Sequence, residues 1–261
     1  MEQLNMEDVK QIEIEMLSFI DQICRENDIK YFLDSGTLLG AIRHKGFIPW
    51  DDDVDIALFR EDYDKLVNLL KDHPKYRAIS YENSTYLFPF AKIIDTTTWV
   101  KTEKFDVYSD LGIYIDLFPI DNIPDSKFKR KVFFNKIWMG RKAINYVAIE
   151  ERKLLSKFYQ KQLKLFFDYI GYKKINSFID SECRKYEKVD TKNITTILGS
   201  FKKIKILEKK WFSETKYVDF ENLKLPIPAG YDEYLKVLYG DYMKLPPGEQ
   251  QCGHGMCAYR K

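Results

Sequence analysis

The stretch FIPWDDDVDIALF, residues 47–59, constrains the fold more than any other part of this chain. It places four aspartates among apolar residues that are typical of a buried strand. Carboxylates in such a place are destabilising unless positive charge or hydrogen bonds compensate for the lost hydration. The sequence therefore predicts a strand over residues 54–59 and, next to it, a source of positive charge.

Period-two alternation separates the four aspartates into two groups. Successive side chains of a strand point to opposite faces, so Asp53 and Asp55 share one face and the apolar residues between and after them share the other. Two carboxylates on one face repel each other, and a divalent cation that prefers oxygen ligands, Mg²⁺ or Mn²⁺, removes that repulsion. Asp51 and Asp52 precede the strand, and they are either solvated turn residues or supports of the site.

A second acidic strand is predicted in GIYIDLFPID, residues 112–121, which is expected to end in a proline turn. Asp116 is a lone acid among the apolar residues of that strand. If the two strands lie side by side, Asp116 supplies a third carboxylate to the same cation. The predicted metal ligands, which are also the predicted catalytic residues, are thus Asp53, Asp55 and Asp116.

Candidate phosphate-binding residues surround this acidic pair. Ser35 and Gly36 stand where a short strand ends and a helix begins, and glycine and free helix N–H groups allow close approach of a phosphate. Arg43 and Lys92 are candidate cationic contacts to phosphate, the first as a bidentate fork and the second as a point charge. For Lys92 a surface or structural role is the alternative.

The hydrophobic periodicity predicts a mixed α+β chain. Helical spacing predicts a first helix over Glu7–Asn27 with Asn5 as its N-cap. From residue 126 to 188 the pattern is helical and rich in Lys, Phe and Tyr, with a break at Gly171. The last part predicts short strands near 194–198 and 217–220, then a loop in KLPIPAGY, a helix in YDEYLKVLYG and a turn-rich tail.

These patterns divide the chain into three predicted parts. A catalytic core of mixed sheet flanked by helices is expected over residues 1–125. A helical subdomain is expected over 126–190, and a C-terminal segment that packs back on the core over 191–261.

Composition limits the classes of partner and compartment. A net charge of +2 is too balanced for nucleic-acid binding by bulk electrostatics. Of the four cysteines, Cys24 and Cys183 lie in helical patterns and do not suggest a disulfide framework, so a reducing compartment is favoured. Since the acidic N-terminus lacks an apolar signal region and no run is long enough to span a membrane, we expect a cytoplasmic protein. Peripheral contact with the inner face of the membrane stays compatible with this.

The tail contains a small cluster of soft ligands in Cys252, His254 and Cys257. A structural zinc site needs four ligands, and the spacing here matches no standard knuckle and shows no clear fourth ligand. The tail is therefore expected to be a turn-rich segment rather than a zinc site.

Three blocks of the sequence resemble the LicD family, which includes bacterial phosphocholine transferases and relatives of fukutin. The blocks are DSGTLLGAIRHKGFIPWDDDVDIAL, IDLFPID and YLKVLYGDYMKLPP, at residues 34–58, 115–121 and 234–247. The resemblance implies a nucleotidyltransferase core like that of polymerase β. Its hallmarks fall on Ser35 and Gly36 for the turn, on Asp53 and Asp55 for the Asp-x-Asp strand, and on Asp116 for the third acid.

The resemblance also implies an activity and its partners. The expected reaction is metal-dependent transfer of a phospho-alcohol, typically phosphocholine from CDP-choline, onto a sugar hydroxyl with release of CMP. The acceptor would be a cell-surface glycan, a lipopolysaccharide or teichoic acid precursor, or a lipid-linked glycan. Related members use other CDP-activated polyols such as CDP-ribitol.

Several further residues near the matched blocks have two interpretations. Asp121 either supports Asp116 or caps the proline turn, and His254, after the Pro-Pro turn, is expected to approach the active site. Trp50 either stacks on a base or packs, and His44 is expected to be a loop residue. Aromatic candidates for holding a quaternary ammonium, each equally suited to the core, are Tyr114, Phe118, Tyr239 and Tyr242.

Three other functions share the same acidic residues. A nucleotidyltransferase would move NMP from NTP to a small molecule or protein and release pyrophosphate. A glycosyltransferase with an Asp-x-Asp motif would need a parallel nucleotide-binding sheet ahead of the motif, where only one strand is predicted. A catalytically inactive glycan-binding relative is disfavoured because the acids are intact.

Overall fold

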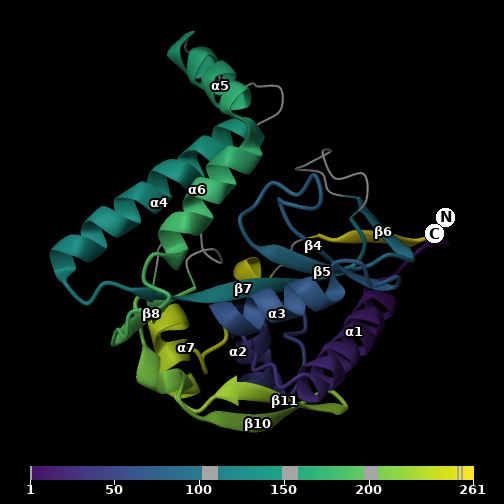
Figure 1. Ribbon diagram of the computed structural model, residues 1–261. Helices are drawn as coiled ribbons and strands as arrows, with labels where there is room; N and C mark the ends of the chain where they lie inside the picture. Colours follow the sequence, from purple (N-terminus) through teal and green to yellow (C-terminus); the bar gives the residue numbers. More distant parts are fainter. Residues whose placement is uncertain (1, 102–110, 149–157, 197–204, 252, 254) are drawn as a thin grey trace.

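The computed structural model describes residues 2–101, 111–148, 158–196, 205–251, 253 and 255–261. As predicted, the protein is α+β, and a mixed sheet with strand order β2-β3-β7-β5-β4 lies at its centre (Figure 1). The strands of this order are β2 (Phe32–Leu33), β3 (Val54–Phe59), β7 (Tyr114–Ile123), β5 (Ala91–Asp95) and β4 (Tyr76–Ile79). Strands β3 and β7 run parallel, and the other neighbours are antiparallel.

Strand β7 is longer than predicted. The prediction of a proline turn at Pro119 is wrong, because the strand continues to Ile123. Its last residues pair with β8 (Asn193–Thr195), and β8 pairs with β9 (Leu207–Glu208). The carbonyl of Ile113 accepts from the N–H of Asp95, next to β5, so the backbone of Ile113 points toward β5. Because backbone groups alternate along a strand, the backbone of Pro119, six residues later, points to the same side of β7. Pro119 falls between the ends of β5 and β8, where a missing N–H breaks no ladder bond.

Three helices pack on this sheet and fix the first half of the chain. Helix α1 (Met6–Glu26) begins at a capping box in which Asn5 and Asp8 bond each other's backbone N–H, as the predicted N-cap requires. Helix α2 (Ser35–His44) precedes β3, and α3 (Arg60–Leu70) follows it directly. Helices α2 and α3 contact β3, in which Val54, Ile56 and Leu58 are fully buried, and α1 contacts β7.

Helices α4 (Lys127–Ala148), α5 (Phe158–Ile170) and α6 (Tyr172–Arg184) form the predicted helical part, which we call the helical arm. Figure 1 shows α4 and α6 side by side, leading away from the sheet, with α5 at their far end. Gly171, with a φ of 82°, separates α5 from α6 as predicted. At Gly140 a Cβ would lie 2.5 Å from Ile179 Cγ1, so α4 and α6 approach closely at this point.

The C-terminal part departs most from its prediction. KLPIPAGY is not a loop, because β11 (Leu223–Pro228) pairs with β10 (Thr215–Phe220) in a hairpin. Helix α7 (Tyr231–Tyr239) follows as predicted, and the 3₁₀ helices η1 (Lys209–Phe212) and η2 (Gly248–Gln250) flank it. The tail ends in β12 (Cys257–Arg260), which lies between β1 (Glu2–Gln3) and β6 (Thr98–Lys101). Strands this short carry too little alternation to be predicted.

Burial agrees with the predicted use of cysteine. Cys24 on α1 and Cys183 on α6 are buried free thiols within the apolar interior. Burial raises the pKa of the Cys24 thiol to about 12, which keeps it inert at neutral pH. In the described part of the chain, no helix combines the length and apolar character that crossing a membrane requires.

Candidate active site

The two acidic strands lie side by side. Parallel pairing of β3 and β7 sets Asp55 directly opposite Asp116, and alternation along β3 puts Asp53 on the same face as Asp55. One carboxylate oxygen from each of the three residues lies within 4.8 Å of the others. The sequence thus located a three-carboxylate cluster, and strand pairing brings its members together.

The carboxylates of this cluster repel one another electrostatically. Burial raises the pKa of Asp55 well above its usual range, and the nearby charges of Asp53 and Asp116 raise it further. Oxygen donors alone, held this close on a rigid sheet, suit a hard divalent cation such as Mg²⁺ or Mn²⁺. The three residues therefore fit the metal that the sequence analysis expects.

Lys92 neighbours the cluster but not as a free phosphate contact. It lies opposite Asp116 in the pairing of β5 with β7, and its ammonium forms an ion pair with the Asp116 carboxylate. The ammonium also sits 3.5 Å from the centre of the Tyr114 ring. The geometry therefore favours a structural role for Lys92, which the sequence analysis gave as the alternative, and the Tyr114 ring lies against its ammonium.

The start of α2 is held against the cluster by hydrogen bonds. Asp34, which is buried, accepts from the Tyr234 hydroxyl on α7, and the Asp55 N–H donates to Thr37 Oγ1 at 2.9 Å. Ser35 takes a left-handed backbone with φ 47°, a strained conformation for a residue with a side chain. At Gly36 a Cβ would lie 2.7 Å from Asp51 Oδ2, so glycine is what lets this carboxylate approach the helix start.

Asp51 and Asp52 have separate roles that the sequence left open. Asp51 lines the cavity in front of the cluster. Asp52 is fully buried and accepts from the Met256 N–H at 2.8 Å, which holds the tail against the core. The solvated-turn alternative is therefore wrong for Asp52. Alternation could have shown this, since Asp52 shares the inward face of Val54.

A cavity of about 1120 Å³ opens over the acids. It is lined by six of the predicted site residues, Ser35, Gly36, Arg43, Asp53, Asp55 and Asp116. It is also lined by Trp50 and by three of the four aromatic candidates for a quaternary ammonium, Phe118, Tyr239 and Tyr242. Arg43 donates to His44 Nε2 at 2.9 Å and to the Tyr242 carbonyl at 3.1 Å, so its guanidinium is fixed at the cavity wall.

Other residues complete the wall, and the sequence analysis did not single them out. They are Phe90, next to β5, and Thr196, Lys205, Asp241, Lys244 and Gln250 of the C-terminal part. Lys205 donates to the Val237 carbonyl at 2.7 Å, which ties it to α7. Lys244 lies in the third matched block, which was the available signal, whereas Lys205 lies outside every matched block.

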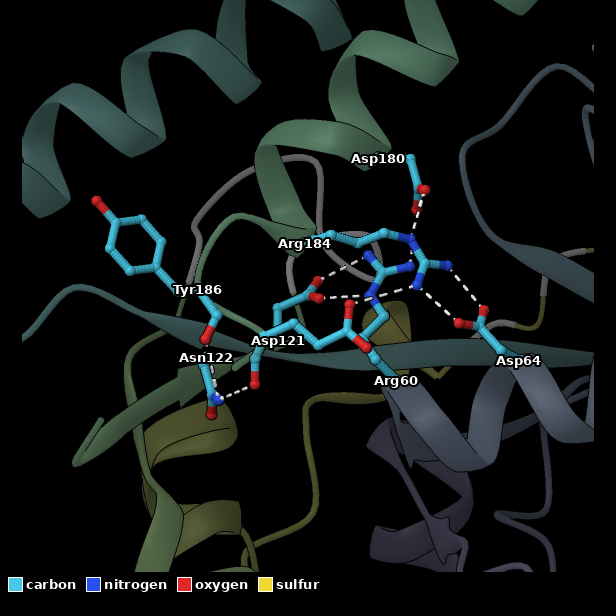
Figure 2. Close-up of polar contacts among 8 residues, drawn as sticks. Arg60, Asp64, Asp121, Asn122, Asp180, Arg184 and Tyr186 are labelled. Carbon is cyan, nitrogen blue, oxygen red and sulfur yellow. Dashed lines mark hydrogen bonds and ion pairs between the residues drawn. The ribbon is translucent and has the colours of Figure 1, made fainter. Parts of the chain in front are cut away.

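Asp121 has a different partner from the predicted ones. It is buried, and its oxygens accept from Arg60 Nε at 2.5 Å and Nη2 at 3.0 Å (Figure 2). Arg60 also reaches Asp180 on α6, where Arg184 joins Asp180 to Asp64. Asp121 is not among the described residues that line the cavity, so the geometry does not favour a contact between Asp121 and a substrate. It does not cap a turn either, because it lies within β7.

The predicted tail cluster lies partly outside the described residues, which exclude Cys252 and His254. Cys257 is exposed at the start of β12, where it pairs with Lys101.

Comparison with known proteins agrees with this geometry. Residues 28–150 match the family model for LicD/FKTN/FKRP, nucleotidyltransferase domain. Over 97% of both chains, the protein is 30% identical to lipopolysaccharide cholinephosphotransferase LicD of Haemophilus influenzae.

A shorter match, 53% identical over 34 residues, links the chain to ribitol 5-phosphate transferase FKRP of Mus musculus and of Homo sapiens. That match covers 13% of this chain and 7% of each relative. The match along nearly the whole length of LicD shows that the chain belongs to the LicD family and is a phosphotransferase enzyme.

Proposed function

We propose that this enzyme transfers phosphocholine from CDP-choline onto a sugar hydroxyl of a cell-surface glycan precursor, a lipopolysaccharide or teichoic acid precursor, and releases CMP. The observation that carries the proposal is the meeting of three carboxylates and a Ser-Gly helix start in one cavity. The whole-length likeness to a cholinephosphotransferase supports the choice of alcohol. We also propose that the core is of the polymerase-β-like nucleotidyltransferase type, in line with the matched family model.

The cavity offers groups for each part of such a donor. Ser35 and Gly36 at the start of α2 line the cavity, where their N–H groups would bind the phosphates, and Arg43, Lys205 and Lys244 supply positive charge from the walls. The faces of Tyr239 and Tyr242 suit a quaternary ammonium, which aromatic rings attract.

The acidic cluster gives the site its chemistry. Asp53, Asp55 and Asp116 would hold Mg²⁺ or Mn²⁺, which supplies charge neutralisation for the diphosphate. Asp116, which forms an ion pair with the Lys92 ammonium, would also accept the proton of the attacking hydroxyl. The acceptor oxygen forms a bond to the distal phosphorus while the bond from that phosphorus to the CMP oxygen breaks. Positioning and charge are sufficient for such a transfer, and no nucleophilic side chain is needed.

A lipid-linked glycan acceptor would place the enzyme at the inner face of the cell membrane. We propose this location together with the acceptor. No nucleic-acid partner is proposed, since the net charge of +2 gives no basis for one.

The test is an assay of product release with Mg²⁺ and a panel of CDP-alcohols. We expect CMP from CDP-choline, and a loss of rate of at least about 100-fold in Asp53→Asn, comparable to the loss of one electrostatic group in other active sites. Asp219→Asn on β10 is the matched control, because it makes the same chemical change at an exposed site. Pyrophosphate release from NTP without CMP release from any CDP-alcohol would favour the nucleotidyltransferase alternative instead.

A further inference from the structure

The helical arm exposes an apolar stripe along α4, which Asn135 interrupts between Val132 and Met139. Phe128, Val132 and Met139 follow one another at helical spacing along the outside of α4, and Phe128 is 77% exposed and Met139 57% exposed. The opposite side of α4 carries the buried residues Phe133, Ile137 and Ile144, which face the rest of the arm. Helix α4 therefore has two apolar faces. One is packed against the rest of the arm, and the other, the stripe, is exposed.

Helix α5 lies at the tip of the arm (Figure 1) and carries a second group of exposed apolar residues. Leu165, Phe166 and Tyr169 lie on one side of it, with exposed fractions of 69%, 56% and 90%. Isolated exposed apolar residues are ordinary, but this many on two adjoining helices mark an interaction surface.

Positive charge accompanies the apolar stripe. Helix α4 contains no acidic residue and carries the basic residues Lys127, Lys129, Arg130, Lys131, Lys136, Arg141 and Lys142. Arg130 bonds the Pro124 carbonyl, and Lys136 pairs with Glu182 at 3.0 Å. The lysines at 127, 129, 131 and 142 are exposed, and Lys142 lies 3.8 Å from the centre of the Trp138 ring.

We propose that this outer face of the helical arm, formed by α4 and α5, docks on an anionic lipid bilayer. Basic residues beside aromatic and aliphatic ones are the composition of helices that lie in the membrane interface, with apolar side chains at the acyl boundary and lysines on phosphate headgroups. Charge decides between a bilayer and a second copy of the chain, because two copies meeting through α4 would set like charges against each other.

The consequence for catalysis rests on the proposed function. If the acceptor glycan is linked to a lipid, docking of the arm would bring the cavity to the membrane that holds its substrate. Lipid binding itself requires neither donor nor acceptor, so it can be measured separately from transfer.

The experiment is co-sedimentation of the full-length protein with vesicles of phosphatidylcholine alone or with phosphatidylglycerol added. We expect binding to the anionic vesicles that high salt releases. In Lys131→Glu/Lys142→Glu, the lipid concentration for half binding should rise by at least about tenfold, since each basic residue near an anionic surface contributes about a factor of five. Lys216→Glu/Lys224→Glu, on the β10–β11 hairpin, makes the same charge change elsewhere and should bind as the unaltered protein does.

A second pair of variants tests the apolar stripe. Phe128→Ser/Met139→Ser should reduce binding, whereas Leu69→Ser/Tyr217→Ser, at exposed positions outside the arm, should not. CMP release from CDP-choline and a water-soluble acceptor should be unchanged in all four variants. The proposal is overturned if anionic vesicles leave the protein in solution. It is also overturned if the arm variants instead abolish a concentration-dependent dimer seen by light scattering.

Discussion

The acidic cluster and the helical arm place charge and apolar surface in opposite ways. On β3 and β7 the carboxylates lie at the floor of a cavity, and contacts with Lys92, Thr37 and Gly36 fix the groups around them. On α4 and α5 the basic and apolar side chains are exposed, and neighbouring groups hold few of them in place. Substitutions at the cluster should therefore change activity and stability by displacing groups or by altering the desolvation of charges. Substitutions on the arm should act through the total exposed apolar area and the net charge of its surface.

The ion pairs of the two regions give the largest contrast. Asp121→Asn removes the buried partner of Arg60 and leaves it only the partly exposed Asp180, and loss of one partner of a buried pair costs about 3–5 kcal/mol. Asp168→Asn breaks the exposed pair with Lys164 on α5, where such pairs contribute about 0–1 kcal/mol. Denaturant unfolding of both variants measures the difference. Equal losses in the free energy of unfolding would show that burial does not make the core ion pair more important for stability than the ion pair on the arm.

Gly36→Ala probes how closely the cluster is packed. The added methyl group would meet Asp51 at 2.7 Å, and Asp51 would move because it is the end of a side chain rather than backbone. We expect about a tenfold or larger loss of CMP release, since small misplacements at a reacting centre are costly. The stability should change by less than about 1 kcal/mol. A variant that unfolds, or one with full activity, would contradict a role in positioning.

The pH dependence of stability tests the repulsion within the cluster. The pKa of Asp55 is raised in the folded state, so the folded protein retains a proton that the unfolded chain has lost above pH about 3.9. The metal-free protein should lose stability as the pH rises from there toward the folded pKa.

Asp55→Asn should not lose stability in this pH range. Measured in EDTA, its Tm should therefore increase relative to that of the unaltered protein as the pH rises. Added Mg²⁺ should stabilise the unaltered protein more at neutral than at acidic pH. If the difference in Tm between Asp55→Asn and the unaltered protein does not change with pH, repulsion between the carboxylates does not explain why the site would bind a cation.

The sequence predicted the cluster better than its surroundings, for physical reasons. Alternation along VDIALF and the apolar neighbours of Asp116 are local signals, so both acidic strands and their facing were predictable. The partners of Lys92 and Asp121 depend on pairing of β7 with β5 and on contact with α3, which join residues distant in the chain. Strands β11 and β12 were missed because proline content and shortness mask them, and tertiary pairing stabilises them.

The central claim is that Asp53, Asp55 and Asp116 form one metal site. Calorimetric titration of the protein with Mn²⁺ tests it most directly, because binding is measured apart from turnover. We expect saturable binding that Asp53→Asn, Asp55→Asn or Asp116→Asn each weakens by about tenfold or more, as loss of groups around a metal commonly does. Asp219→Asn should leave the binding isotherm unchanged. Isotherms for the three variants that match the unaltered protein would show that the cluster is not a metal site.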